Sequence, residues 1–148
     1  MSYWLSSISY ERFQVDEEYE FAVDGYKDTE FNRVLRVEPR DLFVYYIKQL
    51  ALFAALAEAR GRCYLDWGRL WPDGSYPVRF ERRPLLVLPR AQMVPAGPLV
   101  PRLSLSQGRG GESLSLGQLL RFDLREIPQA DFQLIEQEMR RMGEDQLV

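Results

Sequence analysis

The chain contains no histidine, and this absence excludes more chemistry than any other feature of its composition. Histidine is the commonest general base and the commonest metal ligand in proteins. Histidine-based triads and zinc hydrolases are therefore excluded. The single cysteine, Cys63, allows neither a disulfide within the chain nor a cysteine-rich zinc site. We expect no metal, no cofactor and a cytoplasmic location, with Cys63 as a small buried hydrophobe in a strand.

Phosphate-binding motifs and long apolar runs are missing as well. The sequence has no P-loop, GxGxxG or GxSxG, and "GRGG" at 108–111 is predicted to be a flexible tip because no strand and helix flank it. No stretch reaches the ~18 apolar residues of a membrane span, and the start lacks a signal-peptide pattern. The formal net charge of −3 provides no global field for a polyanion or an acidic membrane. Any nucleic acid must therefore be met by local cations, and we expect no membrane partner.

Without histidine, the groups that could still catalyse are a carboxylate pair, a Ser/Lys arrangement or Cys63. Asp66 and Asp73, near an aromatic-rich bend, are the one pair worth testing, but no spacing marks a nucleophile and its base. The acidic run Asp16–Glu20 is interpreted as a solvated face. The sequence therefore predicts a protein that is not an enzyme.

What the chain does have is length and apolar content for one domain over residues 1–148, with 46% hydrophobic and 13% aromatic residues. The run Tyr3–Ile8 mixes aromatic and β-branched residues and predicts an opening strand. Ser9 can then cap a helix over Tyr10–Tyr19. The opening therefore predicts a strand followed directly by a helix.

The segment Asp41–Arg60 is ambiguous. Its second half, "LALFAALAEAR", is rich in helix formers, whereas Leu42–Ile47 has the Val, Ile and Tyr content of a strand. Lys48 and Gln49 separate two apolar runs of strand length. A helix and a hairpin with buried arms are both compatible with these residues.

Further on, "YPVRFE" and "PLLVL" predict two more strands. In the first, Tyr76, Val78 and Phe80 are expected to face one way, and Arg79 and Glu81 the other. Residues 90–117 are rich in Pro, Ser and Gly and are interpreted as an extended surface excursion.

The chain closes with a predicted helix that begins near Pro128 and ends near Gly143. Phe132, Ile135 and Met139 fall on one face of it, at i, i+3 and i+7. We expect this apolar stripe to lie on a sheet.

Taken in order, these pieces resemble the EVE domain family of the PUA-like superfamily. The opening "YWL" and "SYERF" look like that family's first strand and helix, and "RVEPRDLFVYYIKQ" and "LFAALAEARGRCYLD" look like its turn and next two strands. "LWPDGSYPVRFERRPLLVL" is similar to its Trp-Pro-x-x-x-x-Tyr-Pro-Tyr-Arg segment, and "LREIPQADFQLIEQEM" to its closing helix. The resemblance implies an α+β fold, a PUA-like mixed β pseudo-barrel with short flanking helices. It also implies that Leu42–Ile47 and Leu52–Glu58 are paired strands.

Members of this superfamily, which includes YTH-type readers, are thought to bind nucleic acid and hold an everted, often modified base in an aromatic-lined pocket. Aromatic rings replace the stacking that such a base loses, at about 1–3 kcal/mol per base. The resemblance therefore implies a monomer that binds single-stranded or base-flipped DNA or RNA. The alternative is a protein-interaction module that keeps the fold without a working pocket, and the acidic "VDGYKDTE" favours it. An enzyme acting on modified bases or RNA is a third hypothesis.

The resemblance also implies site residues. Those expected to line the base pocket are Phe21, Val23, Asp24, Tyr46, Lys48, Trp71 and Tyr76. Those expected to contact phosphates are Lys27, Arg33, Arg36, Arg69 and Arg79. Phe21 stands where the family usually has Trp, and Ala22 where it has Gly, so the pocket differs in shape.

Physical reasoning from the residues also bears on where five aromatic side chains lie. Trp4 is expected in the core, while Trp67 and Trp71 are compatible with either core or pocket. Tyr45 and Tyr46 should face opposite sides of a strand, with one of them inside.

Overall fold

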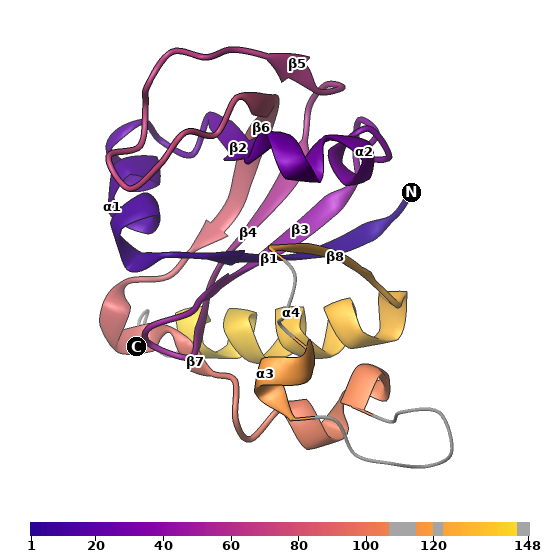
Figure 1. Cartoon of the computed structure of the whole chain (residues 1–148). Coiled ribbons are helices and arrows are strands. Elements are labelled where there is room, and N and C mark those ends of the chain that lie inside the picture. The colour runs from indigo at the N-terminus through magenta and orange to yellow at the C-terminus, as the bar shows by residue number, and fades with distance from the viewer. Residues whose placement is uncertain (107–114, 120–122, 145–148) are drawn as a thin grey trace.

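The computed structural model describes residues 1–106, 115–119 and 123–144 of the chain. A mixed sheet curls into a half-barrel, with α1 and α2 on one side of it and α4 on the other (Figure 1). Its strands are β1 (Tyr3–Ile8), β2 (Val23–Tyr26), β3 (Leu42–Ile47), β4 (Leu52–Ala59), β5 (Tyr64–Leu65), β6 (Val78–Val87), β7 (Val94–Pro95) and β8 (Leu124–Ile127). The helices are α1 (Tyr10–Glu18), α2 (Phe31–Val34), α3 (Leu116–Leu119) and α4 (Gln129–Glu144). The predicted α+β fold is confirmed.

The strands follow the order β2-β6-β4-β3-β1-β8, with β5 added to β6 and β7 to β4. β1 runs parallel to β3 and antiparallel to β8, so Tyr3 lies opposite both Leu42 and Ile127. The other pairings are antiparallel. Helix α1 follows β1 directly, and the Ser9 side chain caps it by accepting from the Arg12 N–H at 3.1 Å. The predicted opening strand and helix are confirmed.

β3 and β4 form the hairpin that the resemblance implied, with Leu42 opposite Glu58 and Ile47 opposite Leu52. The alanine-rich second arm is a strand despite its helix propensity because β4 is interior to the sheet and buried on both faces. Ala54, Ala55 and Ala57 are fully buried there. Tertiary burial outweighs a propensity difference of less than about 1 kcal/mol per residue.

Two predictions about the middle of the chain are wrong. "YPVRFE" and "PLLVL" belong to one strand, β6, which continues through Pro84 beside a register irregularity in β4. On the polar face of this strand Arg79 is nevertheless buried, because the loop of residues 66–76 covers its side of β6. Cys63 lies just before β5, half-buried and outside any strand, because the chain leaves the sheet between β4 and β5.

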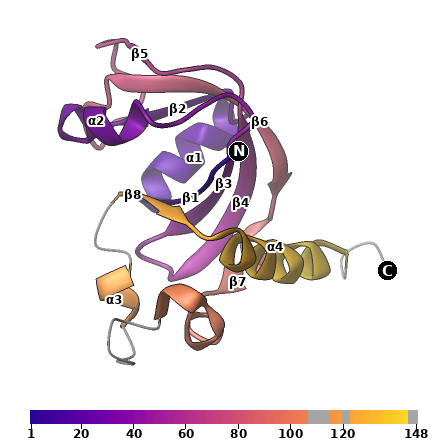
Figure 2. The same ribbon diagram turned by 90° about the vertical axis from the view of Figure 1, so that its right-hand side faces the viewer.

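The expected surface excursion is also wrong over residues 90–106, because its apolar side chains are needed to cover the sheet beside α4 (Figure 2). Met93, Val94, Leu99 and Leu103 are buried there. Val94 belongs to the short strand β7, and the other three flank 3₁₀ turns. Asp131 of α4 fastens this segment by accepting from the backbone N–H and hydroxyl of Ser104, at 2.7 and 2.9 Å. Residues 108–111, predicted to be a flexible tip, lie outside the described residues.

Helix α4 carries the predicted apolar stripe. Phe132, Ile135 and Met139 are at most 1% exposed, and α4 contacts β1, β3 and β4. The prediction that this stripe lies on a sheet is confirmed. Within the described ranges, no helix combines the length and apolar character that crossing a membrane requires.

Candidate functional site

Four charged side chains are buried together where α1, β2 and β6 meet. This buried charge cluster consists of Arg12, Asp16, Asp24 and Arg82, each at most 4% exposed. Arg12 Nη2 lies 3.1 Å from Asp24 Oδ1, and Arg82 Nη2 lies 3.1 Å from Asp16 Oδ1. Arg82 Nη1 reaches Asp24 Oδ2 at 3.5 Å, at ion-pair distance but without hydrogen-bond geometry. The expectation that the acidic run is a solvated face is therefore wrong at Asp16.

The helix positions two members of the cluster. Arg12 and Asp16 are four residues apart on α1, so both point from the same face. Burial raises the pKa of Asp16, although the nearby Arg82 and Arg12 lower it in part. Burial by itself would lower the pKa of Arg12, but Asp24 and Asp16 raise it above the ordinary value. Arg12 therefore remains a cation inside the protein.

Asp24 is the acceptor at the centre of this network. The phenols of Tyr26 and Tyr45 each donate to its Oδ2 at 2.8 Å, and the Gly25 N–H donates to its Oδ1 at 2.8 Å. Burial, together with the Asp24 charge, raises the pKa of both phenols well above 10. The phenols therefore stay protonated and act as donors to the carboxylate.

Arg12 also lies against three aromatic rings, which we call the ring cluster: Tyr26, Trp71 and Tyr76. Its guanidinium carbon is 4.2 Å from the Tyr76 centroid, 4.9 Å from that of Trp71 and 5.9 Å from that of Tyr26. Arg12 Nη2 additionally donates to the Gly25 carbonyl at 2.7 Å. The cation is thus enclosed by ring faces and fixed by acceptors.

The bend "WPDGSYP" is what brings two of these rings to the cluster. Trp71 is fully buried and its Nε1 donates to Asp16 Oδ1 at 3.0 Å. Gly25 permits this approach, because a Cβ there would lie only 2.5 Å from Trp71 Cζ3. Trp71 and Tyr76 meet edge to face, with centroids 5.5 Å apart. Rings around this bend are therefore core residues that wall in Arg12.

Arg79 of β6 contacts the same loop at three points. Its Nε donates to the Tyr76 carbonyl at 3.0 Å, Nη2 contacts the Gly68 carbonyl, and Nη1 lies 3.3 Å from Asp66 Oδ2. With only 6% of its surface exposed, Arg79 is committed to these partners. The predicted phosphate contact by Arg79 stays a prediction, and it would compete with these contacts to the loop.

A small cavity of about 110 Å³ opens beside the cluster, where β1 and β3 end. We call it the β1-end cavity, and its lining residues are Ser7, Ile8, Ser9, Arg12, Lys27, Lys48, Asp73, Tyr76 and Asp123. Two of these residues carry buried polar atoms without a hydrogen-bond partner, Ser7 Oγ and Arg12 Nε. Because native structures rarely leave buried polar atoms unpaired, a ligand or a water molecule is the expected partner of these two atoms.

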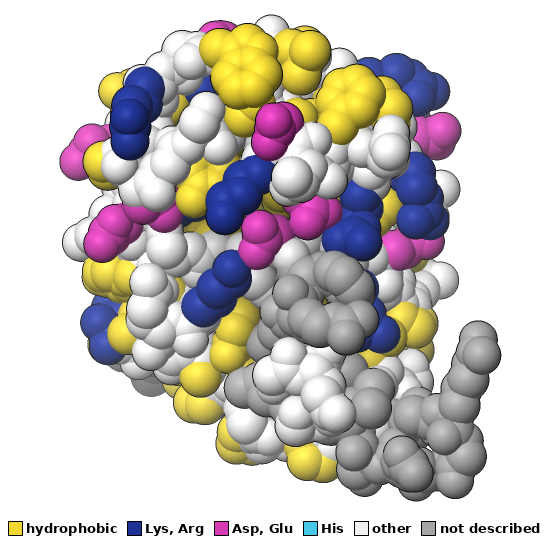
Figure 3. Space-filling view, viewed as in Figure 1, with side chains coloured by type: hydrophobic (Ala, Val, Ile, Leu, Met, Phe, Trp, Pro, Cys, Tyr) yellow, Lys and Arg dark blue, Asp and Glu magenta, His cyan; other side chains and the backbone are white. Residues whose placement is uncertain are grey.

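Charges of both signs surround this cavity. Lys48 Nζ pairs with Asp123 at 2.8 Å, and Asp73 accepts from the Ser9 and Tyr76 hydroxyls at 2.7 and 3.2 Å. Figure 3 likewise shows basic and acidic side chains interleaved across the middle of one face, with no uniform basic patch there. The cavity therefore offers local cations within a nearly neutral surrounding.

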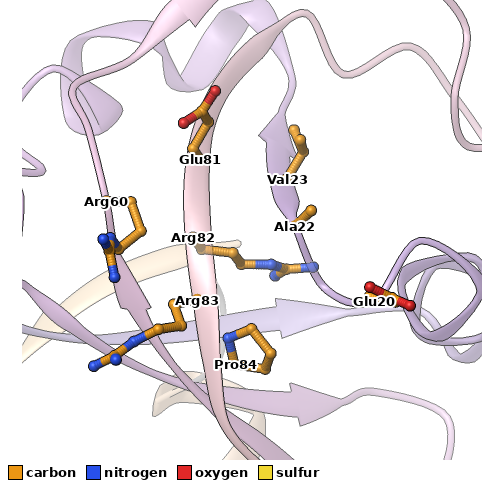
Figure 4. Close-up of a pocket in the computed structure, with 8 residues that line it drawn as sticks. All are labelled: Glu20, Ala22, Val23, Arg60, Glu81, Arg82, Arg83 and Pro84. Carbon is orange, nitrogen blue, oxygen red and sulfur yellow. The ribbon is translucent and has the colours of Figure 1, made fainter.

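A second depression, the β2–β6 groove, lies on the sheet edge and measures about 430 Å³. Its lining residues are Glu20, Ala22, Val23, Arg60, Glu81, Arg82, Arg83 and Pro84 (Figure 4). Arg82 and Arg83 leave β6 on opposite sides, so that Arg82 enters the buried charge cluster while Arg83 stays exposed (Figure 4). Arg82 is the member of the buried charge cluster that lines this groove.

The predicted pocket residues do not meet at one cavity. Lys48 and Tyr76 line the β1-end cavity, together with Lys27, whereas Val23 lines the β2–β6 groove. The remaining four are at most 4% exposed: Phe21, Asp24, Tyr46 and Trp71. The open pocket expected between Phe21, Tyr46 and Trp71 is not seen among the described residues, because these rings pack in the core. Ligand contact by each residue stays a prediction.

The other predicted phosphate contacts are Lys27, Arg33, Arg36 and Arg69, and the three arginines have partners within the protein. Arg36 pairs with Glu126 at 2.9 Å, Arg33 pairs with Glu30 at 3.0 Å, and Arg69 donates to the Pro72 carbonyl at 3.2 Å. Of these, only Lys27 lines the β1-end cavity. Their roles toward phosphates remain predictions.

The aromatics left open by the sequence divide clearly. Trp4 is fully buried, as expected, and Trp67 is 65% exposed. Tyr45 and Tyr46 are both buried, so the expectation of only one inside is wrong, because both faces of β3 are covered. Sequence reasoning missed Arg12, Asp16 and Arg82, although the four-residue spacing of Arg12 and Asp16 on a predicted helix was a usable signal.

Comparison with known proteins shows both a relative and a shared fold. No family model matches the chain. A UPF0310 protein of Pyrococcus abyssi is 30% identical over 148 residues, which covers 92% of this chain and 98% of the relative. The Pho92 YTH domain in complex with m6A superposes with a TM-score of 0.68 at 15% identity, covering 93% of this chain and 86% of that one.

Two further solved structures agree. The YTH domain of Zygosaccharomyces rouxii MRB1 in complex with N6-methyladenosine RNA gives a TM-score of 0.67 at 14% identity, covering 93% of this chain and 86% of that one. The Mmi1 YTH domain in complex with RNA gives 0.66 at 11% identity, covering 98% and 81%. At these identities the likeness concerns the fold alone.

Proposed function

This chain belongs to the UPF0310 family, and from that premise, together with the fold it shares with YTH domains, we propose that it binds single-stranded RNA without catalysis. One flipped base would be held at the β1-end cavity. The resemblance to EVE domains supports the same function. We take residues 1–148 as one domain that acts as a cytoplasmic monomer.

The observation that carries the proposal is the composition of the β1-end cavity. Tyr76 is the aromatic residue of the cavity lining, and the part of its ring that Arg12 leaves uncovered would stack on the base. Lys27 and Lys48 offer positive charge for the adjoining backbone. Ser7 Oγ and Arg12 Nε lack partners within the protein and can hydrogen-bond a base edge. The cavity thus combines the three kinds of contact that a flipped base requires.

The cavity's size limits what it can hold. Pockets for drug-sized ligands measure about 300–1,000 Å³, whereas this one is about 110 Å³. A single planar base or part of it is therefore the appropriate guest, with the rest of the nucleotide outside. A single strand costs less to present an unstacked base than a duplex does, which favours single-stranded RNA.

Charge predicts weak, local binding. The formal net charge is −3, and Asp73 and Asp123 stand beside the two lysines. Since phosphate contacts supply most non-specific affinity, the salt dependence should correspond to only one or two phosphates. RNA affinity should therefore depend more on the stacked base than on backbone contacts.

Fluorescence anisotropy with labelled RNA oligonucleotides tests the proposal, in strands with and without N6-methyladenosine. Tyr76→Ala should weaken binding by about 1–3 kcal/mol through lost stacking. Tyr19→Ala is the matched control, because Tyr19 is 54% exposed and outside the cavity lining. Circular dichroism establishes that both variants fold. Equal binding by folded Tyr76→Ala and the parent protein would refute the base site.

A protein-interaction module is the second candidate, and the filled ring cluster favours it. In that case no RNA or DNA strand in the screen would bind at low salt. DNA strands of the same sequence form a parallel arm, since the contacts proposed for the base do not involve a 2′-hydroxyl. Tighter binding of DNA than RNA would redirect the proposal to DNA.

A further inference from the structure

The ring cluster already has an occupant, the guanidinium of Arg12. A planar cation over aromatic faces is attracted by the ring quadrupole, most strongly when water is excluded. Its carbon lies within 5 Å of the Tyr76 and Trp71 centroids, at 4.2 and 4.9 Å. Arg12 is only 3% exposed, so the rings and the guanidinium enclose one another.

The polar edge of Arg12 is fixed as firmly as its faces. Nη2 donates to both the Asp24 carboxylate and the Gly25 carbonyl, at 3.1 and 2.7 Å. Asp24 would keep other partners if Arg12 were removed, since Tyr26, Tyr45 and Arg82 also contact it. The walls of the ring cluster and Asp24 therefore have supports other than Arg12.

We propose that Arg12 is a built-in ligand of the ring cluster, and that it makes this protein insensitive to methylation of the base it binds. The second half rests on the proposed function. A methyl group adds affinity only where apolar walls surround it. Here those walls are covered by Arg12, and the β1-end cavity presents mostly polar groups, including the Ser7 hydroxyl and the edge of Arg12.

The first half is tested without RNA. Arg12→Ala leaves a guanidinium-sized space between the rings, and the unfolding temperature of this variant should rise by several degrees in non-denaturing guanidinium chloride relative to equal sodium chloride. Arg83→Ala is the matched control, because the Arg83 side chain is exposed and pairs with Glu58 at 3.5 Å, away from the ring cluster. Its unfolding temperature should not rise. A folded Arg12→Ala variant that responds as Arg83→Ala does would overturn the assignment.

A measurement on the unaltered protein decides the question if Arg12→Ala does not fold. In the NMR spectrum of labelled arginine side chains, the Arg12 Hε should be shifted upfield by the surrounding rings. Arg12→Lys, which keeps a positive charge beside Asp24, identifies that signal by its loss. If the signal that disappears has an ordinary chemical shift, the guanidinium is not enclosed by the rings.

Insensitivity to methylation is tested by anisotropy on paired RNA strands with adenosine or N6-methyladenosine. The parent protein should bind both within about twofold, far below the ~10–200-fold that a methyl group fitted by apolar walls can bring. Folded Arg12→Ala should gain about tenfold preference for the methylated strand. A tenfold preference in the parent protein overturns the inference. If neither strand binds while guanidinium still rescues Arg12→Ala, the proposed function fails and the occupancy of the ring cluster stands.

Discussion

Two regions of the core are stabilised in opposite ways. Beneath α4, Phe132, Ile135 and Met139 lie on the sheet, and the stabilisation comes from apolar surface removed from water. Between α1, β2 and β6, the buried charge cluster is surrounded by aromatic rings and its stability depends on mutual pairing. An apolar contact is lost in proportion to the atoms removed, whereas losing one member of a buried ion cluster leaves another charge without compensation.

The largest expected effect follows from removing Arg82. Arg82→Met should lower the free energy of unfolding by about 3–5 kcal/mol. Two buried carboxylates, Asp16 and Asp24, would then have Arg12 as the remaining cation of the cluster. Urea denaturation followed by circular dichroism measures the loss. Arg83→Met is the neighbouring control, and its exposed pair with Glu58 should be worth less than about 1 kcal/mol. Similar losses in the two variants would mean that the cluster behaves like surface charge.

Removing a single hydrogen bond to the cluster should have a smaller effect. Tyr45→Phe deletes the phenol that donates to Asp24 at 2.8 Å while keeping the ring. Hydrogen bonds to charged groups contribute about 1.5–3 kcal/mol, so a loss in that range is expected at pH 7. An unchanged midpoint in urea would show that Asp24 is satisfied without Tyr45.

The same variant has a distinctive pH dependence. The folded-state pKa of Tyr45 is raised above its unfolded value near 10, first by burial and then by Asp24. Its contribution to stability is therefore fully present below about pH 10 and is lost as the pH rises above it, at up to ~1.4 kcal/mol per pH unit. Because Tyr45→Phe lacks this proton, its deficit relative to the parent should shrink between pH 10 and 11. A constant deficit over that interval would contradict the assignment.

In the apolar region, Ile135→Val removes one methylene beneath α4. The expected loss is about 0.5–1.5 kcal/mol, since the fully packed site cannot collapse completely around the gap. Unlike the Tyr45→Phe deficit, this loss should stay the same from pH 7 to pH 11. A loss that varied with pH would indicate coupling between the two regions.

The smallest effect is expected at the exposed face of α4. Arg140 pairs with Glu136 at 3.2 Å across one helical turn. Arg140→Gln should cost about 0.3–0.5 kcal/mol, and the difference should vanish in high salt because exposed pairs are screened. Urea midpoints at low and high ionic strength measure it. A larger, salt-resistant loss would place this pair among the buried interactions.

The two regions also differ in how far the sequence predicts them. The apolar stripe of α4 is predicted from the sequence, because apolar residues at helical spacing indicate a helix face that packs on the core. Arg82 and Arg83 are identical residues side by side, and which of them enters the core depends on how β6 pairs with β2 and β4. That pairing is a property of the whole sheet, so no local pattern distinguishes the buried arginine from the exposed one.

The site was predictable only in part for a related reason. Lys48 and Tyr76 were expected in a pocket, and both line the β1-end cavity. Phe21, Tyr46 and Trp71 were expected beside them but are buried. Trp71 packs against Arg12, Phe21 against Phe13 and Tyr46 against Phe53, and no local sequence pattern shows these contacts. The β3–β4 hairpin needed the resemblance, since propensity alone favoured a helix over its alanine-rich arm.

The pairing of β1 with both β3 and β8 has a consequence for the order of events in folding. Tyr3 lies opposite Ile127, so β1 gains its second neighbour in the sheet only after β8, far along the sequence, has been made. Contacts this distant in sequence slow folding, because a long loop must close before they form. Until β8 arrives, one edge of β1 exposes unpaired backbone groups, the kind of edge that recruits other chains. We therefore expect nascent chains that stop before residue 124 to be the species most prone to aggregate.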